Sequence, residues 1–148
     1  MSGGLRLFTA GYEGRSLAQF GELLRQNGVR RLIDVRERAF SFKKGFSKTP
    51  LREGLAGFGV EYVHAPATGS PSGVRKRLHE TGDYETFFAD YKKHLAGLNG
   101  SLSAVVEQAY SGNACLMCFE RDFEKCHRSA LAEEIRRVGG NGLKIIHL

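Results

Sequence analysis

The amino-acid sequence predicts a single three-layer α/β domain over residues 1–148, with a mainly parallel, Rossmann-like sheet of about five strands. Three observations support this prediction. Short apolar runs alternate with longer segments in which apolar residues recur every three or four positions, the period of a helix. The chain has the length of one domain. Its hydrophobic content of 41% and charged content of 26% are ordinary for a globular protein.

Five short apolar runs are expected to form the strands, at residues 5–9, 31–35, 60–64, 114–118 and 144–147. Helical segments separate these runs, so we expect right-handed crossovers between strands that run parallel. Parallel strands bring their carboxyl ends to one edge of the sheet, and open α/β sheets bind their ligands at that edge.

The helices between these strands have recognisable start signals. Ser16 and Gln19 have the spacing of a capping box, and Thr49 followed by Pro50 predicts the start of the second helix. The segment 65–83 lacks a helical pattern and is interpreted as a long loop with room for one helical turn. Further helices are expected from Tyr84 to Leu98, from Leu102 to Ala109 and from Cys126 to Val138.

Polar side chains follow the strands at the predicted carboxyl edge. Asp34 and Arg36 end the second strand two positions apart, so they lie on one face. They form either a structural ion pair or an anion-binding arginine oriented by a carboxylate. Glu120 is the candidate general acid or base, and His64 either shares this role or is held by a hydrogen bond. The residues expected to meet at this edge are Tyr12, Glu13, Arg15, Asp34, Arg36, His64, Cys118 and Glu120.

The most concentrated chemistry lies between the fourth strand and the helix that follows it. Cys118 ends the strand, and Cys126 begins the helix just before His127 and Arg128. Free amides and the helix dipole lower the pKa of a thiol at a helix start, so this pattern predicts a reactive cysteine assisted by His127. The alternative is that these cysteines are small buried hydrophobic residues, which is the expectation for Cys115 in the middle of the strand.

Known thiol and zinc sites resemble this segment only in part. Sulfurtransferase and cysteine-phosphatase loops wrap an anion around a cysteine and close with an arginine, but Cys118 and Arg128 are about twice as far apart in sequence as in such a loop. A second partial resemblance lies in the second predicted strand, where residues 32–36 look like the Ile-Asp-Val-Arg segment of rhodanese domains.

No metal is expected, because the candidate ligands do not have a recognised zinc spacing. These ligands would be His64, Cys118, Cys126 and His127.

The charge pattern points to an anionic partner. The formal net charge is +6, and residues 36–48 hold five basic residues against one acidic residue. Lys43 and Lys44 lie there among three phenylalanines, a combination typical of contacts with nucleic-acid bases and phosphates. The alternative is a loop that buries its phenylalanines and leaves its lysines in water. The phenylalanines are Phe40, Phe42 and Phe46.

The sequence also carries expectations about location. An odd number of cysteines argues against a disulfide framework and favours a reducing cytoplasm. No apolar run approaches the roughly 18 residues of a membrane span, so we expect no membrane association. Residues 1–4 lead directly into the first strand, so no secretory signal is expected.

Several short motifs occur in a characteristic order along the chain. They are Thr9-Ala-Gly-Tyr-Glu-Gly-Arg-Ser16, Asp34-Val-Arg36, Tyr62-x-His-x-Pro66, Cys118-x-Glu120 and Cys126-His127-Arg128. Together they resemble the prokaryotic family catalogued as domain of unknown function 488, over nearly the whole chain. The resemblance implies a small cytoplasmic α/β domain, and it implies no settled activity. Its Leu-Gly-Gly type run is replaced here by Ala67-Thr-Gly-Ser70, so the rim of the pocket is expected to differ.

These observations favour an enzyme or ligand-binding domain for an anionic substrate, a nucleotide or a nucleic acid. Glu120 would transfer protons with help from His127 or Cys126, while Arg36, Arg128 and the lysine loop would bind phosphates. Two alternatives remain open: sulfur transfer or redox chemistry at Cys118 or Cys126, and a non-catalytic module in which these residues form a structural polar network. The sequence points to no particular cofactor or oligomeric state.

Overall fold

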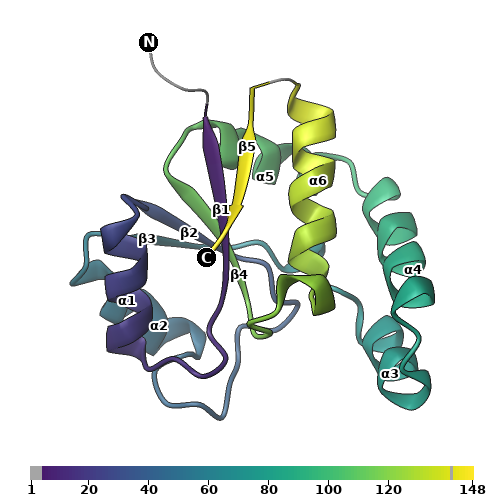
Figure 1. Cartoon of the computed structure of the whole chain (residues 1–148), viewed down its shortest axis with the longest axis horizontal. Coiled ribbons are helices and arrows are strands. Elements are labelled where there is room, and N and C mark those ends of the chain that lie inside the picture. The colour runs from purple at the N-terminus through teal and green to yellow at the C-terminus, as the bar shows by residue number, and fades with distance from the viewer. Residues whose placement is uncertain (1–4, 141) are drawn as a thin grey trace.

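The computed structural model describes residues 5–140 and 142–148 and confirms the predicted α/β class (Figure 1). Its five strands are all parallel and lie in the order β3-β2-β4-β1-β5. The expectation for residues 1–4 lies outside the described part. The strands are β1 (Arg6–Gly11), β2 (Arg31–Asp34), β3 (Glu61–His64), β4 (Ala114–Cys118) and β5 (Lys144–His147).

Helices cover both faces of the sheet, which makes three layers (Figure 1). On one face, α1 (Leu17–Gln26) and α2 (Lys48–Ala56) contribute to a buried apolar cluster. On the other face, α5 (Gly100–Tyr110) and α6 (His127–Gly139) pack against the sheet, and α4 (Tyr84–Ala96) packs against α6. Because β4 is buried on both faces, its alternate residues enter different clusters, Cys115 with α1 and α2 and Cys118 with α5 and α6.

The helix starts follow the sequence signals in one case and depart from them in the other. The capping box of α1 is confirmed, because Gln19 donates its amide to Ser16 Oγ at 3.1 Å and accepts from the Ser16 amide at 2.8 Å. The predicted start at Thr49 is wrong, because Ser47 is the N-cap of α2. The Ser47 hydroxyl does not cap the helix, because it accepts from the Ser41 amide and donates to the Ser41 carbonyl, which closes the basic loop.

The prediction of a long loop over 65–83 is wrong as well. This segment holds a short 3-10 turn, Pro66–Thr68, and a helix, α3 (Ser72–Thr81). None of the residues of α3 is buried, so the helix lacks the apolar periodicity that would reveal it in a sequence. Gly69 lies so close to the chain after β2 that an added Cβ would come within 2.3 Å of the Glu37 amide nitrogen. This close approach places α3 beside the carboxyl edge of the sheet.

The topology creates a crevice at that edge. The chain leaves β2 toward β3, whereas it leaves the neighbouring strand β4 in the opposite direction, toward β5. A ligand site is expected where neighbouring strands part in this way, at their carboxyl ends. Across the described residues, the structure contains no helix long and apolar enough to cross a membrane.

Candidate functional site

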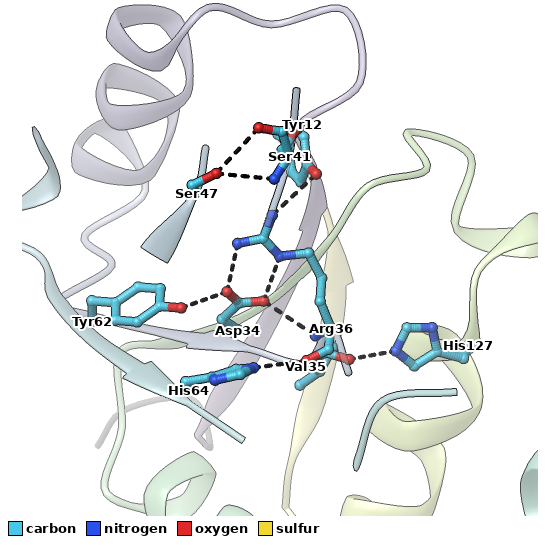
Figure 2. Close-up of polar contacts among 9 residues, drawn as sticks. All are labelled: Tyr12, Asp34, Val35, Arg36, Ser41, Ser47, Tyr62, His64 and His127. Carbon is cyan, nitrogen blue, oxygen red and sulfur yellow. Dashed lines mark hydrogen bonds and ion pairs between the residues drawn. The ribbon is translucent and has the colours of Figure 1, made fainter. Parts of the chain in front are cut away.

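The centre of the candidate site is a buried ion pair at the end of β2 (Figure 2). Arg36 donates from Nε to Asp34 Oδ1 at 2.8 Å and from Nη2 to Asp34 Oδ2 at 2.7 Å, and both side chains are buried. Arg36 Nη1 also donates to the Tyr12 hydroxyl at 3.1 Å. Two of the five N–H groups of a guanidinium therefore remain for a ligand.

The Asp34 carboxylate is fully surrounded by donors. Tyr62 donates its hydroxyl to Asp34 Oδ2 at 2.6 Å, and the Arg36 amide donates to Asp34 Oδ1 at 3.1 Å. Burial alone would lower the pKa of Arg36, but the hydrogen bonds and charge of Asp34 raise it. Burial and the hydrogen bond to Asp34 also raise the pKa of Tyr62. The Arg36 guanidinium is therefore permanently charged, and its bonds to Asp34 hold it in one orientation.

Two imidazoles hold the backbone that carries this pair (Figure 2). His64 Nε2 lies 2.8 Å from the Arg36 carbonyl oxygen, and His127 Nε2 lies 2.7 Å from the Val35 carbonyl oxygen. A carbonyl only accepts, so both Nε2 atoms carry the proton. Burial lowers the pKa of His127 to about 4, against the opposing effect of its bond to Val35. His127 is therefore a neutral residue that positions β2, and its Nε2 is not free to act on a substrate.

The neutral state of His127 predicts a pH-dependent stability. Its pKa rises from about 4 in the folded protein toward 6.5 in the unfolded chain, so the unfolded state binds more protons in this window. The free energy of unfolding is expected to fall between pH 6.5 and 4, by up to about 3 kcal/mol. Urea denaturation at a series of pH values measures this loss. The His127→Gln variant should lack it, and an equal loss in that variant would assign the effect to other groups.

The cysteines depart from the prediction that no disulfide forms. Cys118 and Cys126 are joined by a disulfide that connects the end of β4 to the N-cap of α6. An odd number of cysteines does not exclude this pairing, because the tight turn between β4 and α6 brings these two sulfurs together. Cys115 is the free cysteine, and burial raises its pKa to about 12, as expected for a small buried hydrophobic residue. In the reduced state, Cys118, Cys126 and Glu120 would offer three ligand atoms within 4.8 Å of one another.

Arg128 is completely buried and binds the turn itself. Its Nε donates to Thr9 Oγ1 at 3.1 Å, its Nη2 donates to the Arg121 carbonyl at 3.1 Å, and its Nη1 contacts Cys118 Sγ at 3.0 Å. A further bond from Nη1 reaches the Glu120 carbonyl. The same carbonyl lies against Gly11, where an added Cβ would come within 1.9 Å of the oxygen. Arg128 therefore fixes the backbone around Glu120, and this position does not match the predicted role of binding phosphate.

A cavity of about 260 Å³ opens beside these residues. It gathers five of the predicted site residues, namely Tyr12, Arg36, Cys118, Glu120 and His127. The other predicted residues are not part of its wall. Asp34 and His64 hold Arg36, Cys126 and Arg128 lie at the start of α6, and Lys43 and Lys44 lie in the basic loop. Glu13 and Arg15, which were also expected at this edge, are not part of the wall either. Sequence reasoning did not place Glu37, Arg38, Phe40, Ser70, Arg75 and Phe119 on this wall.

A second cavity of about 390 Å³ continues from the first. Both are lined by Ser70, Arg75, Phe119 and Glu120, so the two cavities adjoin, and together we call them the groove. Its far end is lined by residues of α3 and α4 and by Lys125. A larger depression of about 610 Å³ lies along α1, but it contains none of the predicted site residues except Arg15.

Glu120 lies where the two cavities meet. Its carboxyl group is half-buried, and burial raises its pKa despite the nearby charges of Arg128 and Arg75. Arg75 donates to Glu37 Oε1 at 3.0 Å and to the Ser70 carbonyl, which holds its guanidinium at the rim of the groove. Arg75 begins the basic run Arg75-Lys76-Arg77 in α3, and its place at the groove depends on this helix, which the sequence did not predict.

The aromatic residues of the basic loop divide between core and surface. Phe46 is buried and stacks on Tyr12 with ring centroids 4.4 Å apart, which supports the alternative that this loop packs into the core. Phe40 is 59% exposed and lines the groove, and Phe119 is 45% exposed with its ring edge against Tyr12. The groove therefore presents aromatic faces to solvent at several points.

Comparison with known proteins identifies one family. A family model described as domain of unknown function DUF488 matches residues 16–135. No curated protein and no solved structure matches the chain. The matched range contains the predicted site residues except Tyr12, Glu13 and Arg15. Four of the five ordered motifs lie inside it, and the first motif, residues 9–16, lies before it except for Ser16.

Proposed function

The chain belongs to the family described as domain of unknown function DUF488, and we propose that it is an enzyme acting on a nucleotide or nucleic acid bound along the groove. One observation carries this proposal. A half-buried carboxyl group, Glu120, lines two adjoining cavities whose walls carry arginines and exposed aromatic rings.

The positive charge along the groove favours phosphate groups. Arg38 and Arg75 line the first cavity, and Arg75 and Lys125 line the second. Arg36 adds the two free N–H groups of a guanidinium that is already oriented by Asp34. Arginines held in this way bind phosphate oxygens with little loss of side-chain entropy, since their orientation is fixed before the ligand arrives.

The aromatic rings favour bases. Phe40 and Phe119 border the first cavity, and Tyr84, which is 38% exposed, borders the second. Stacking of a base on such a ring contributes about 1–3 kcal/mol and tolerates any base, because every base has a π face. The two cavities together fall in the size range of small-molecule sites, roughly 300–1,000 Å³. A groove with both features suits a base and its neighbouring phosphates.

Glu120 is the group in this groove with the environment of a proton-transfer residue. Its raised pKa brings a carboxylic acid closer to neutral pH, where it can both give and accept a proton. The alternative was that the polar residues form a purely structural network. Asp34, Arg36 and Tyr62 fit this alternative, because they form hydrogen bonds with one another. Glu120 does not fit it, because Glu120 lines the groove.

Binding of nucleic acid tests this proposal directly. Fluorescence anisotropy with labelled single-stranded DNA and RNA is expected to show binding at low salt that weakens steeply as salt is added. Arg38→Glu, and Lys43→Glu combined with Lys44→Glu, should each reduce the affinity at least about tenfold. Arg52→Glu, at an exposed position of α2, is the matched control and should change little. If the folded protein binds no DNA, RNA or nucleotide at low salt, the proposal fails.

A further inference from the structure

We propose that the Cys118–Cys126 disulfide is a thiol–disulfide exchange centre, at which a low-molecular-weight thiol entering the groove attacks Cys118 and displaces Cys126. This inference goes beyond the proposed function and does not depend on it. It assigns different roles to the two sulfurs, and the roles follow from where each sulfur lies.

Cys118 is the cysteine that borders the groove. Both cysteines are buried, with Cys118 1% and Cys126 0% exposed, but Cys118 lines the first cavity beside Phe119 and Glu120, whereas Cys126 is not part of the wall. Attack on a disulfide occurs at one sulfur and expels the other. An attacking thiol that enters from the groove therefore meets Cys118 first, and Cys126 is the leaving group.

Cys126 occupies a position that stabilises a leaving thiolate. It is the N-cap of α6, and its Sγ accepts a hydrogen bond from the Arg128 amide at 3.5 Å. The free amides and dipole of a helix start favour a negative sulfur, and a more stable thiolate leaves faster. A thiolate, like a carboxylate, is therefore a favourable group at the start of this helix.

Arg128 stabilises the other sulfur. Its guanidinium is completely buried, and its recorded partners are the Thr9 hydroxyl, two carbonyls and Cys118 Sγ, with Nη1 3.0 Å from that sulfur. The ion pairs recorded within residues 5–140 and 142–148 do not include Arg128. A buried cation without an anion in contact is unfavourable. A thiolate at Cys118 would supply the negative counter-charge for the Arg128 guanidinium.

The exchange balances with two equivalents of a thiol such as glutathione. The first thiolate attacks Cys118 Sγ, the protein S–S bond breaks, and Cys126 leaves as a thiolate that takes up a proton. A second thiolate attacks the glutathione sulfur of the mixed disulfide and releases Cys118 as a thiolate. Two glutathione molecules are oxidised to their disulfide, and the protein disulfide is reduced to two thiols.

Two serine variants separate the roles of the sulfurs. In Cys126→Ser, serine preserves the helix cap, and Cys118 stays as a free thiol on the residue that borders the groove. With oxidised glutathione, intact mass spectrometry is expected to show one mixed disulfide per chain, located at Cys118 by peptide mapping. Cys118→Ser should form a mixed disulfide at Cys126 at least about tenfold more slowly, because Cys126 is fully buried and does not line the groove. Cys115→Ser is the matched control and should react as the unmodified protein does.

Three results would overturn the proposal. One is a Cys126→Ser variant that has a native circular dichroism spectrum and forms no mixed disulfide. Another is equal reactivity of the two serine variants. The third is a protein that, purified without reductant, holds one zinc ion per chain with Cys118 and Cys126 both present as thiols, since these sulfurs and Glu120 would then be metal ligands. None of these results alters the binding measured with nucleic acid, so failure of this proposal is distinguishable from failure of the proposed function.

Discussion

Replacing Asp34 with alanine is expected to lower the free energy of unfolding by about 3–5 kcal/mol. The substitution leaves the buried Arg36 guanidinium without its counter-charge and leaves the Tyr62 hydroxyl without its acceptor. Breaking a buried pair from one side is costly, because the surviving charge stays in a poorly solvated place. Urea denaturation of the variant and the unmodified protein at one pH measures the difference.

The double variant Asp34→Leu with Arg36→Met provides the control. Because this double variant has neither charge, it leaves no buried charge without a partner. It is therefore expected to recover most of the stability that is lost in Asp34→Ala. Tyr62→Phe removes one hydrogen bond to the same carboxylate and should cost only about 1 kcal/mol. A loss below about 1 kcal/mol in Asp34→Ala would mean that the pair is not held as the structure describes it.

The predictable part of this fold is the part that the core determines. Strands such as β4 are buried on both faces, so they appear in the sequence as continuous apolar runs, and the carboxyl edge follows from their parallel order. The start of α1 was predictable because a capping box is a local signal. By contrast, α3 buries none of its residues, so the pattern that reveals a helix is missing from its sequence.

The location of the site could be predicted from the sequence, but the contacts of its side chains could be predicted only in part. Tyr12, Arg36, Cys118 and Glu120 reach one cavity because each follows a neighbouring parallel strand. Arg75 was missed as a wall residue because it arrives on α3. Arg128 was expected to bind phosphate, since it begins a helix, but the carbonyls of Glu120 and Arg121 occupy its donors instead. Residue type and spacing do not distinguish a ligand oxygen from a carbonyl oxygen of the next turn.

The substitution Glu120→Gln is expected to reduce turnover of a nucleic-acid substrate by about 10²–10⁴-fold and to leave its affinity nearly unchanged. Glutamine keeps the size of the side chain but cannot exchange a proton. Mass spectrometry of single-stranded oligonucleotides and nucleotides incubated with each protein detects conversion. The matched control is Glu124→Gln, an exposed carboxylate in the same turn, which should retain full turnover.

The effect of the same substitution on stability separates a catalytic from a structural role. Burial raises the pKa of Glu120 above its ordinary value of 4.5, so the unfolded chain binds fewer protons than the folded protein in this range. Stability is therefore lost as the pH rises through the raised pKa, and a glutamine, which does not ionise, avoids this loss. A catalytic Glu120 thus predicts that Glu120→Gln is as stable as the unmodified protein at neutral pH, or more stable. A clear loss of stability with unchanged turnover would instead show that this carboxyl group holds the turn together.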